Sequence, residues 1–202
     1  MNSLLAIPWL YDLAQHMMRG TRYQQHLVEN HLRIAPGDRV LDIGCGTGAL
    51  LDCLPRLVPE IQYVGFDMSP AYLAAARRKH GSRGQFHCVE LTPQTVADFG
   101  QFNSVLAIGV LHHLDDAAAD TLFAIAHRVL RPGGRLITLD GVFIEDQSWL
   151  VKRLLESDRG KHVRTESAYR ALASRVFGQV QTLVSQDLFR IPYTTLIMEC
   201  TP

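Results

Sequence analysis

The segment that decides the fold reads Val40-Leu41-Asp42-Ile43-Gly44-Cys45-Gly46-Thr47-Gly48, an apolar run that passes directly into alternating glycines. Residues 39–43 are short, apolar and preceded by a turn at 36–38, as expected of a buried parallel strand. The glycines allow close approach of a ligand, and the helix expected at 48–57 offers unpaired N–H groups to an anion. We therefore expect a strand, a ligand-binding loop and a helix, with a ligand-free tight turn as the alternative.

The glycine spacing fits more than one cofactor. Gly44, Gly46 and Ala49 satisfy the dinucleotide-binding fingerprint, so this loop does not by itself identify the ligand. Asp67 ends the next expected strand, 62–66, close to the offset at which an acidic side chain binds ribose hydroxyls. The pattern indicates a cofactor that contains ribose, and the alternative is that Asp67 only starts the following helix.

Strand and helix patterns alternate along most of the chain. Ser69 followed by Pro70 is a typical helix start. The alternation predicts right-handed crossovers and a mostly parallel sheet. Further strands are expected at 85–89, 103–109, 135–140, 176–184 and 187–199, and helices at 69–80, 116–130 and 165–175.

These patterns predict an α/β fold: a Rossmann-like, doubly wound, seven-stranded sheet with an antiparallel C-terminal hairpin strand. Residues 1–34 are expected to form an N-terminal helical cap, and residues 35–202 a single domain.

Composition excludes several classes of protein. The chain has 202 residues, of which 47% are hydrophobic, and its 20 basic residues balance its 20 acidic ones. This charge balance argues against a general nucleic-acid binder. No apolar run approaches the length of a membrane span, and the histidines lack metal-site spacing, so neither membrane nor metal is expected. The cysteines form no C-x-x-C pair and favour a reducing, cytoplasmic location.

Several segments together resemble the motifs of class I S-adenosylmethionine-dependent methyltransferases. Residues 40–48 resemble the first motif, 63–69 the second, and 107–114 and 130–136 two further signatures. Nicotinamide-dependent enzymes do not usually carry the last two. The resemblance implies a methyltransferase domain that binds S-adenosyl-L-methionine and releases S-adenosyl-L-homocysteine. The alternatives are a nicotinamide-dependent oxidoreductase on a similar sheet, and a non-catalytic protein that binds S-adenosylmethionine.

The resemblance also assigns residues to parts of the cofactor. Asp67 would bind the ribose, Met68 would pack on the adenine, and the carbonyl of Ile108 would meet the methionine amino group. Glu90 stands where the family often has Asp. The residues assigned to the cofactor are Asp42, Gly44, Cys45, Gly46, Asp67, Met68, Glu90, Leu91 and Ile108.

Two histidines follow the expected strand 103–109 at the cofactor end of the sheet. A neutral imidazole near pH 7 suits a general base. His112 is the candidate base, and His113 would support the loop or the cofactor. For either residue the alternative is a histidine bonded to backbone in a turn. Because an oxygen acceptor benefits most from a base, we expect in-line methyl transfer to oxygen of a small molecule.

Basic and aromatic residues around the expected acceptor site suggest an anionic substrate. Arginine forks match carboxylate or phosphate groups. A solvated polar loop and ordinary packing are the alternatives, and a homodimer is the candidate assembly. The residues assigned to the substrate are Tyr11, Arg22, Arg159, Arg164, Arg190 and Tyr193.

Overall fold

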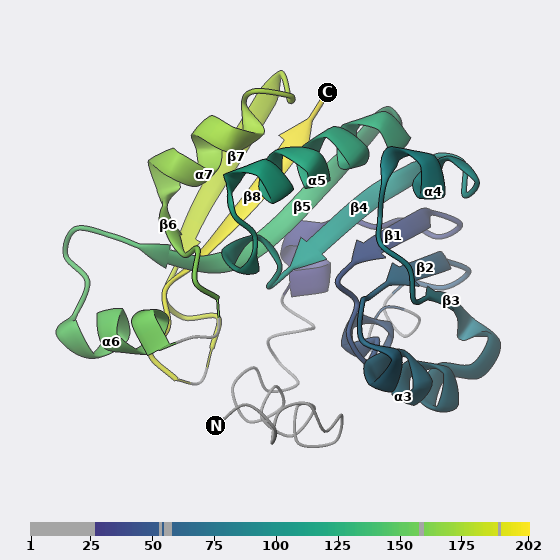
Figure 1. The fold of residues 1–202 in the computed structure, drawn as a ribbon, viewed down its shortest axis with the longest axis horizontal. Coiled ribbons are helices and arrows are strands. Elements are labelled where there is room, and N and C mark those ends of the chain that lie inside the picture. Colours follow the sequence, from purple (N-terminus) through teal and green to yellow (C-terminus); the bar gives the residue numbers. More distant parts are fainter. Residues whose placement is uncertain (1–26, 53, 55–57, 158–159, 190) are drawn as a thin grey trace.

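The computed structural model describes residues 27–52, 54, 58–157, 160–189 and 191–202 (Figure 1). Most of the predicted N-terminal cap, residues 1–26, lies outside this part of the chain. The cap's described end is one π-helical turn, η2 (Val28–Leu32), which buries Val28 and Leu32. No helix in the described part of the chain is long and apolar enough to cross a membrane.

The described strands form one eight-stranded sheet. They are β1 (Arg39–Ile43), β2 (Gln62–Phe66), β3 (Gly84–His87), β4 (Phe102–Ile108), β5 (Leu130–Phe143), β6 (Arg164–Thr165), β7 (Gln179–Ser185) and β8 (Thr195–Thr201). The α-helices are α3 (Pro70–His80), α4 (Pro93–Ala97), α5 (Asp116–Val129), α6 (Trp149–Ser157) and α7 (Glu166–Ala173). Short 3-10 turns are η3 (Ala49–Asp52), η4 (Gly81–Arg83) and η5 (Leu111–His113).

The strand order is β3-β2-β1-β4-β5-β8-β7, with β6 attached to β5. The pairs from β3 to β5 are parallel, whereas β8 runs antiparallel to both β5 and β7. The predicted fold class is therefore confirmed, including the antiparallel final strand. Strand β6 was not predicted, because two residues are too few to show any alternation of apolar and polar side chains.

Three elements differ most from the prediction. Strand β5 begins at Leu130, because Leu130 already pairs with Phe102 before a register irregularity. Strand β8 begins at Thr195 and not near residue 187, because the preceding segment leaves the sheet and buries Leu188 and Tyr193. The helix expected at 48–57 is a 3-10 turn over its described residues Ala49–Asp52.

Neighbouring residues of the central strands face opposite sides of the sheet. Leu41 of β1 belongs to the core under α5 and α7, whereas Val40 packs toward η2 and α3. Figure 1 shows α4, α5 and α7 together along one side of the sheet, and α3 on the other. Both faces are thus covered, which explains why the central strands read as continuous apolar runs.

The strand order places a candidate ligand site between β1 and β4. Strand β1 continues to β2 on one side, while β4 lies on the other, so the loops after β1 and β4 diverge at their carboxyl ends. In doubly wound sheets, ligands bind outside the carboxyl ends at such a reversal of strand order. The glycine loop and the two histidines both lie at this edge.

Candidate functional site

The glycine loop turns sharply after β1 and leans on the loop after β4. Gly44 has φ of 72°, a region that favours glycine, and a Cβ placed on it would lie 2.6 Å from Val110 Cγ2. The amides of Gly44 and Cys45 donate to the Phe66 carbonyl oxygen at 2.8 and 3.0 Å. These amides therefore hold the loop on β2, and the lack of a side chain at Gly44 lets the loop pack closely against Val110.

Asp67 at the end of β2 connects this loop to the start of α3. Its Oδ2 accepts from the Gly46 amide at 2.9 Å, and its Oδ1 accepts from the Ser69 amide at 2.8 Å. A carboxylate offers about four acceptor positions, so Asp67 can still accept from ribose hydroxyls. Its contact with the glycine loop was not predicted, since only the folded loop brings Gly46 to it.

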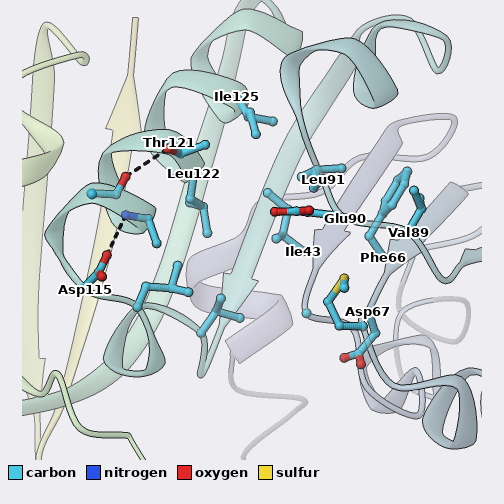
Figure 2. Close-up of a pocket in the computed structure, with 16 residues that line it drawn as sticks. Ile43, Phe66, Asp67, Val89, Glu90, Leu91, Asp115, Thr121, Leu122 and Ile125 are labelled. Atoms are coloured by element: carbon cyan, nitrogen blue, oxygen red, sulfur yellow. Dashed lines mark hydrogen bonds between the residues drawn. The ribbon is translucent and has the colours of Figure 1, made fainter.

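A cavity of about 580 Å³ opens beside Asp67. Figure 2 shows Leu122 and Ile125 of α5 facing Ile43 and Leu91 across it, with Asp67 at its edge. The walls are mostly apolar, and Asp67 and Glu90 add carboxylates from the β2 and β3 ends. The lining residues are Ile43, Gly44, Phe66, Asp67, Met68, Val89, Glu90, Leu91, Val110, Leu114, Asp115, Ala117, Ala118, Thr121, Leu122 and Ile125.

Five of the residues predicted to bind the cofactor line this cavity together: Gly44, Asp67, Met68, Glu90 and Leu91.

The remaining predicted cofactor residues do not line this cavity. Asp42 is buried and accepts from the Tyr63 hydroxyl at 2.5 Å. Burial raises the pKa of Tyr63, so its hydroxyl stays a donor. Burial likewise raises the pKa of the Cys45 thiol, which stays neutral. Asp42 is bonded to Tyr63 of β2, and Cys45 packs against Gly65 of the same strand. The Gly46 amide is bound by Asp67, and Ile108 packs toward the opposite core.

His112 forms a buried pair with Asp140, the last residue of the predicted strand 135–140. The His112 Nδ1 lies 2.7 Å from Asp140 Oδ1, and the His112 backbone amide donates to the same oxygen at 3.1 Å. The two side chains are 9% and 2% exposed. Sequence reasoning missed Asp140; its only signal was a carboxylate at the carboxyl end of an apolar strand.

This pairing fixes how the imidazole can act. With its Nδ1–H donated to a carboxylate, a histidine takes up a further proton on Nε2, and the resulting positive charge is stabilised by that carboxylate. The arrangement suits a general base. His113 is exposed, and its ring centroid lies 4.1 Å from that of His112, so the two rings are in contact.

The predicted substrate residues do not form one group in the described part of the chain. Tyr11, Arg22, Arg159 and Arg190 lie outside it. Tyr193 is buried in a small cluster with Val151 and Leu155 of α6. Arg164 binds backbone carbonyls and Asp116, so its guanidinium is not open to an anionic substrate in this structure.

Comparisons with known proteins show which family and which fold this chain resembles. The model of a methyltransferase domain family matches residues 41–136. The malonyl-[acyl-carrier protein] O-methyltransferase of Hahella chejuensis is 34% identical over 167 residues, which is 80% of this chain and 56% of that protein. The demethylmenaquinone methyltransferase of Thermus thermophilus is 34% identical over 137 residues, or 64% of this chain and 60% of that protein. Residues 41–136 are a methyltransferase domain of the class I S-adenosylmethionine-dependent kind.

Solved structures of methyltransferases share the fold. The pyocyanin biosynthetic protein PhzM superposes with a TM-score of 0.73 at 17% identity, covering 96% of this chain and 58% of that one. Human N-acetylserotonin methyltransferase in complex with S-adenosylmethionine gives a TM-score of 0.70 at 19% identity, covering 96% and 55%. The chain thus spans 55–60% of the length of these two proteins and of the two relatives above.

The residues present fit the cofactor of this family, S-adenosylmethionine. Gly44 lines the cavity and has no side chain, so its backbone can approach a ligand there. Asp67 retains acceptor positions for hydroxyls, and Phe66, Leu91 and Met68 offer apolar surface to a flat base. Within the described residues, no cluster of three or more His, Cys, Asp or Glu side chains could hold a metal ion.

Proposed function

We propose that this methyltransferase transfers a methyl group from S-adenosylmethionine to a hydroxyl oxygen of a small molecule, with His112 as the general base. The observation that carries this proposal is the 2.7 Å contact between His112 Nδ1 and Asp140 Oδ1. The pair stands at the carboxyl ends of β4 and β5, and Val110, two residues before His112, touches the glycine loop.

Different residues of the chain have different roles in the proposed methyl transfer. The cofactor, when bound, supplies a methyl group activated by a positively charged sulfur. The cavity beside Gly44 and Asp67 holds the donor, and such positioning contributes roughly 7–11 kcal/mol in favourable cases. As the acceptor oxygen forms its bond to the methyl carbon, the bond from that carbon to sulfur would break and release neutral S-adenosylhomocysteine. His112 would take the hydroxyl proton on Nε2, and Asp140 would stabilise the imidazolium. A base of this kind adds about 10²–10⁴-fold to the rate.

The name of one relative raises a second kind of oxygen acceptor. The Hahella chejuensis protein is a malonyl-[acyl-carrier protein] O-methyltransferase. A carboxylate acceptor has no proton to lose and would need no base, whereas a hydroxyl acceptor would. The buried pair of His112 and Asp140 therefore favours the hydroxyl. The N–H groups of Arg164 already donate to Leu114 and Asp116, so this residue no longer supports the prediction of an anionic substrate.

The acceptor can be found with a labelled methyl donor. The protein is incubated with S-adenosylmethionine carrying a labelled methyl group and a cell metabolite extract, and labelled products are analysed by mass spectrometry. We expect an alkali-stable methyl ether and an equal amount of S-adenosylhomocysteine. An alkali-labile ester or an N-methyl product would overturn the hydroxyl assignment. Tight binding of NADH, with no binding of S-adenosylhomocysteine, would overturn the methyltransferase activity itself.

Asp67 should contribute measurably to cofactor affinity. Asp67→Ala is expected to weaken S-adenosylhomocysteine binding by about 1.5–3 kcal/mol, the range for hydrogen bonds to charged groups. Calorimetry measures the change, and Asp98→Ala, which removes an exposed carboxylate at the end of α4, is the control. An unchanged Kd in folded Asp67→Ala protein would remove Asp67 from the cofactor site.

A further inference from the structure

We propose that Arg164 is a positioning residue that sets the geometry of the His112–Asp140 pair. The proposal rests on the proposed function only for its catalytic consequence. The structural relation among the three residues can be tested without a substrate.

The side chain of Arg164 is fully engaged within the protein. Its Nε and Nη2 donate to Asp116 Oδ1 at 3.0 and 2.7 Å. Its Nη1 donates to the carbonyl oxygens of Leu111 and His162 at 3.1 and 2.9 Å, and Nη2 donates to that of Leu114 at 2.7 Å. A guanidinium has five N–H groups in a rigid fork, so these contacts account for all of them. The side chain is only 10% exposed.

Two of these contacts hold the turn that carries His112. Leu111 begins η5 and Leu114 follows its end, and the Leu114 amide also donates to the Leu111 carbonyl. Arg164 therefore binds the turn on both sides of His112. Because Asp116 starts α5, the same guanidinium also fixes where this turn meets the helix.

The backbone of Arg164 is attached to the strand that carries the other partner. In strand β6, Arg164 pairs with Val142 of β5, two residues beyond Asp140. One residue thus connects the strand of Asp140 to the turn of His112. A change in its side chain would let the turn move relative to β5 and alter the distance between the two side chains.

The segment before Arg164 packs directly on the histidine. The His162 amide donates to the His112 carbonyl oxygen at 2.9 Å. At Gly160 an added Cβ would overlap the His112 ring, so only glycine lets the chain pass this closely. Since Arg164 also binds the His162 carbonyl, it fixes this covering segment and the turn beneath it as one unit.

The test replaces the guanidinium group of Arg164 and either keeps or removes its positive charge. Arg164→Lys keeps the charge but offers a single ammonium group, and Arg164→Gln removes the charge. Arg175→Gln is the matched control, because Arg175 also binds a carboxylate of α5, Asp120 at 2.6 Å, which is one helical turn further from η5 than Asp116. The ¹⁵N shifts of the His112 ring, assigned by their loss in His112→Ala, report its tautomer at a pH where titration shows the ring neutral.

We expect one tautomer, with the proton on Nδ1, in the wild type and in Arg175→Gln. In Arg164→Gln the two ring shifts should move toward each other as the tautomers exchange, and Arg164→Lys should lie between. The Kd for S-adenosylhomocysteine should rise by less than about tenfold, because Arg164 does not itself line the cofactor cavity and reaches it only through Leu114. Once an acceptor is known, kcat should fall about tenfold or more without a matching rise in KM.

Wild-type ring shifts in folded Arg164→Gln protein would overturn the proposal, as would equal shift changes in Arg175→Gln. If Arg164→Gln does not fold, the ring shifts of His112 are measured in Arg164→Lys, and wild-type shifts there would overturn the proposal. Failure of the wild type to bind S-adenosylhomocysteine would instead overturn the proposed function. The ring shifts would still test whether Arg164 sets the geometry of the His112–Asp140 pair.

Discussion

Replacement of His112 by alanine should lower kcat by about 10²–10⁴-fold while leaving the Kd for S-adenosylhomocysteine nearly unchanged. The reason is geometric: His112 does not line the cofactor cavity, but it is held 2.7 Å from Asp140 at the carboxyl end of the same sheet. The pH–rate profile should lose the acid-side ionisation that the wild type shows. Initial rates of S-adenosylhomocysteine formation with the identified acceptor measure both effects.

Two further variants separate basicity from position. His112→Gln can still accept and donate hydrogen bonds but cannot take up a full proton. Asp140→Asn keeps an oxygen for Nδ1–H but lacks the charge that stabilises the imidazolium, and it should lower kcat substantially. Near wild-type turnover in His112→Gln would show that His112 positions the acceptor. Near wild-type turnover in His112→Ala would rule out the base and indicate an acceptor that loses no proton.

Replacement of Gly44 by alanine should weaken S-adenosylhomocysteine binding by about 2–4 kcal/mol, or about 30- to 1,000-fold. The added Cβ would lie 2.6 Å from Val110 Cγ2, at a φ of 72° that L-residues rarely adopt. The free protein would relieve this overlap by moving the loop, and binding would have to restore it. Calorimetry measures the affinity, and circular dichroism confirms the fold.

The chain supplies a matched control for backbone strain. Gly37 has φ of 83°, and a Cβ there would meet nothing within 4 Å. Gly37→Ala should therefore lower stability slightly without weakening cofactor binding. Adding Val110→Ala to Gly44→Ala should recover part of the lost affinity, since it removes the overlapping methyl group. Normal affinity in Gly44→Ala alone would show that the loop does not approach the cofactor.

Short-range patterns predicted much of the framework. The apolar run 39–43 is β1, and the Ser69-Pro70 start is the N-cap of α3, where Ser69 Oγ accepts from the Tyr72 amide. Helix α5 follows the predicted span closely and is capped by Asp115. These elements depend on residues a few positions apart, and side-chain periodicity and capping record such interactions directly in the sequence.

Local patterns in the sequence therefore predicted most strands and helices along the chain, the glycine loop and the presence of a histidine beside it. The partners of these groups became known only from the folded chain. Asp140 is 28 residues from His112, Gly46 is 21 from Asp67, and Arg164 is 48 from Asp116. No local pattern encodes such pairs, because they meet only when strand order and register bring separate loops to one edge of the sheet. For the same reason an arginine that looked suited to a substrate anion is committed to the turn that holds the base.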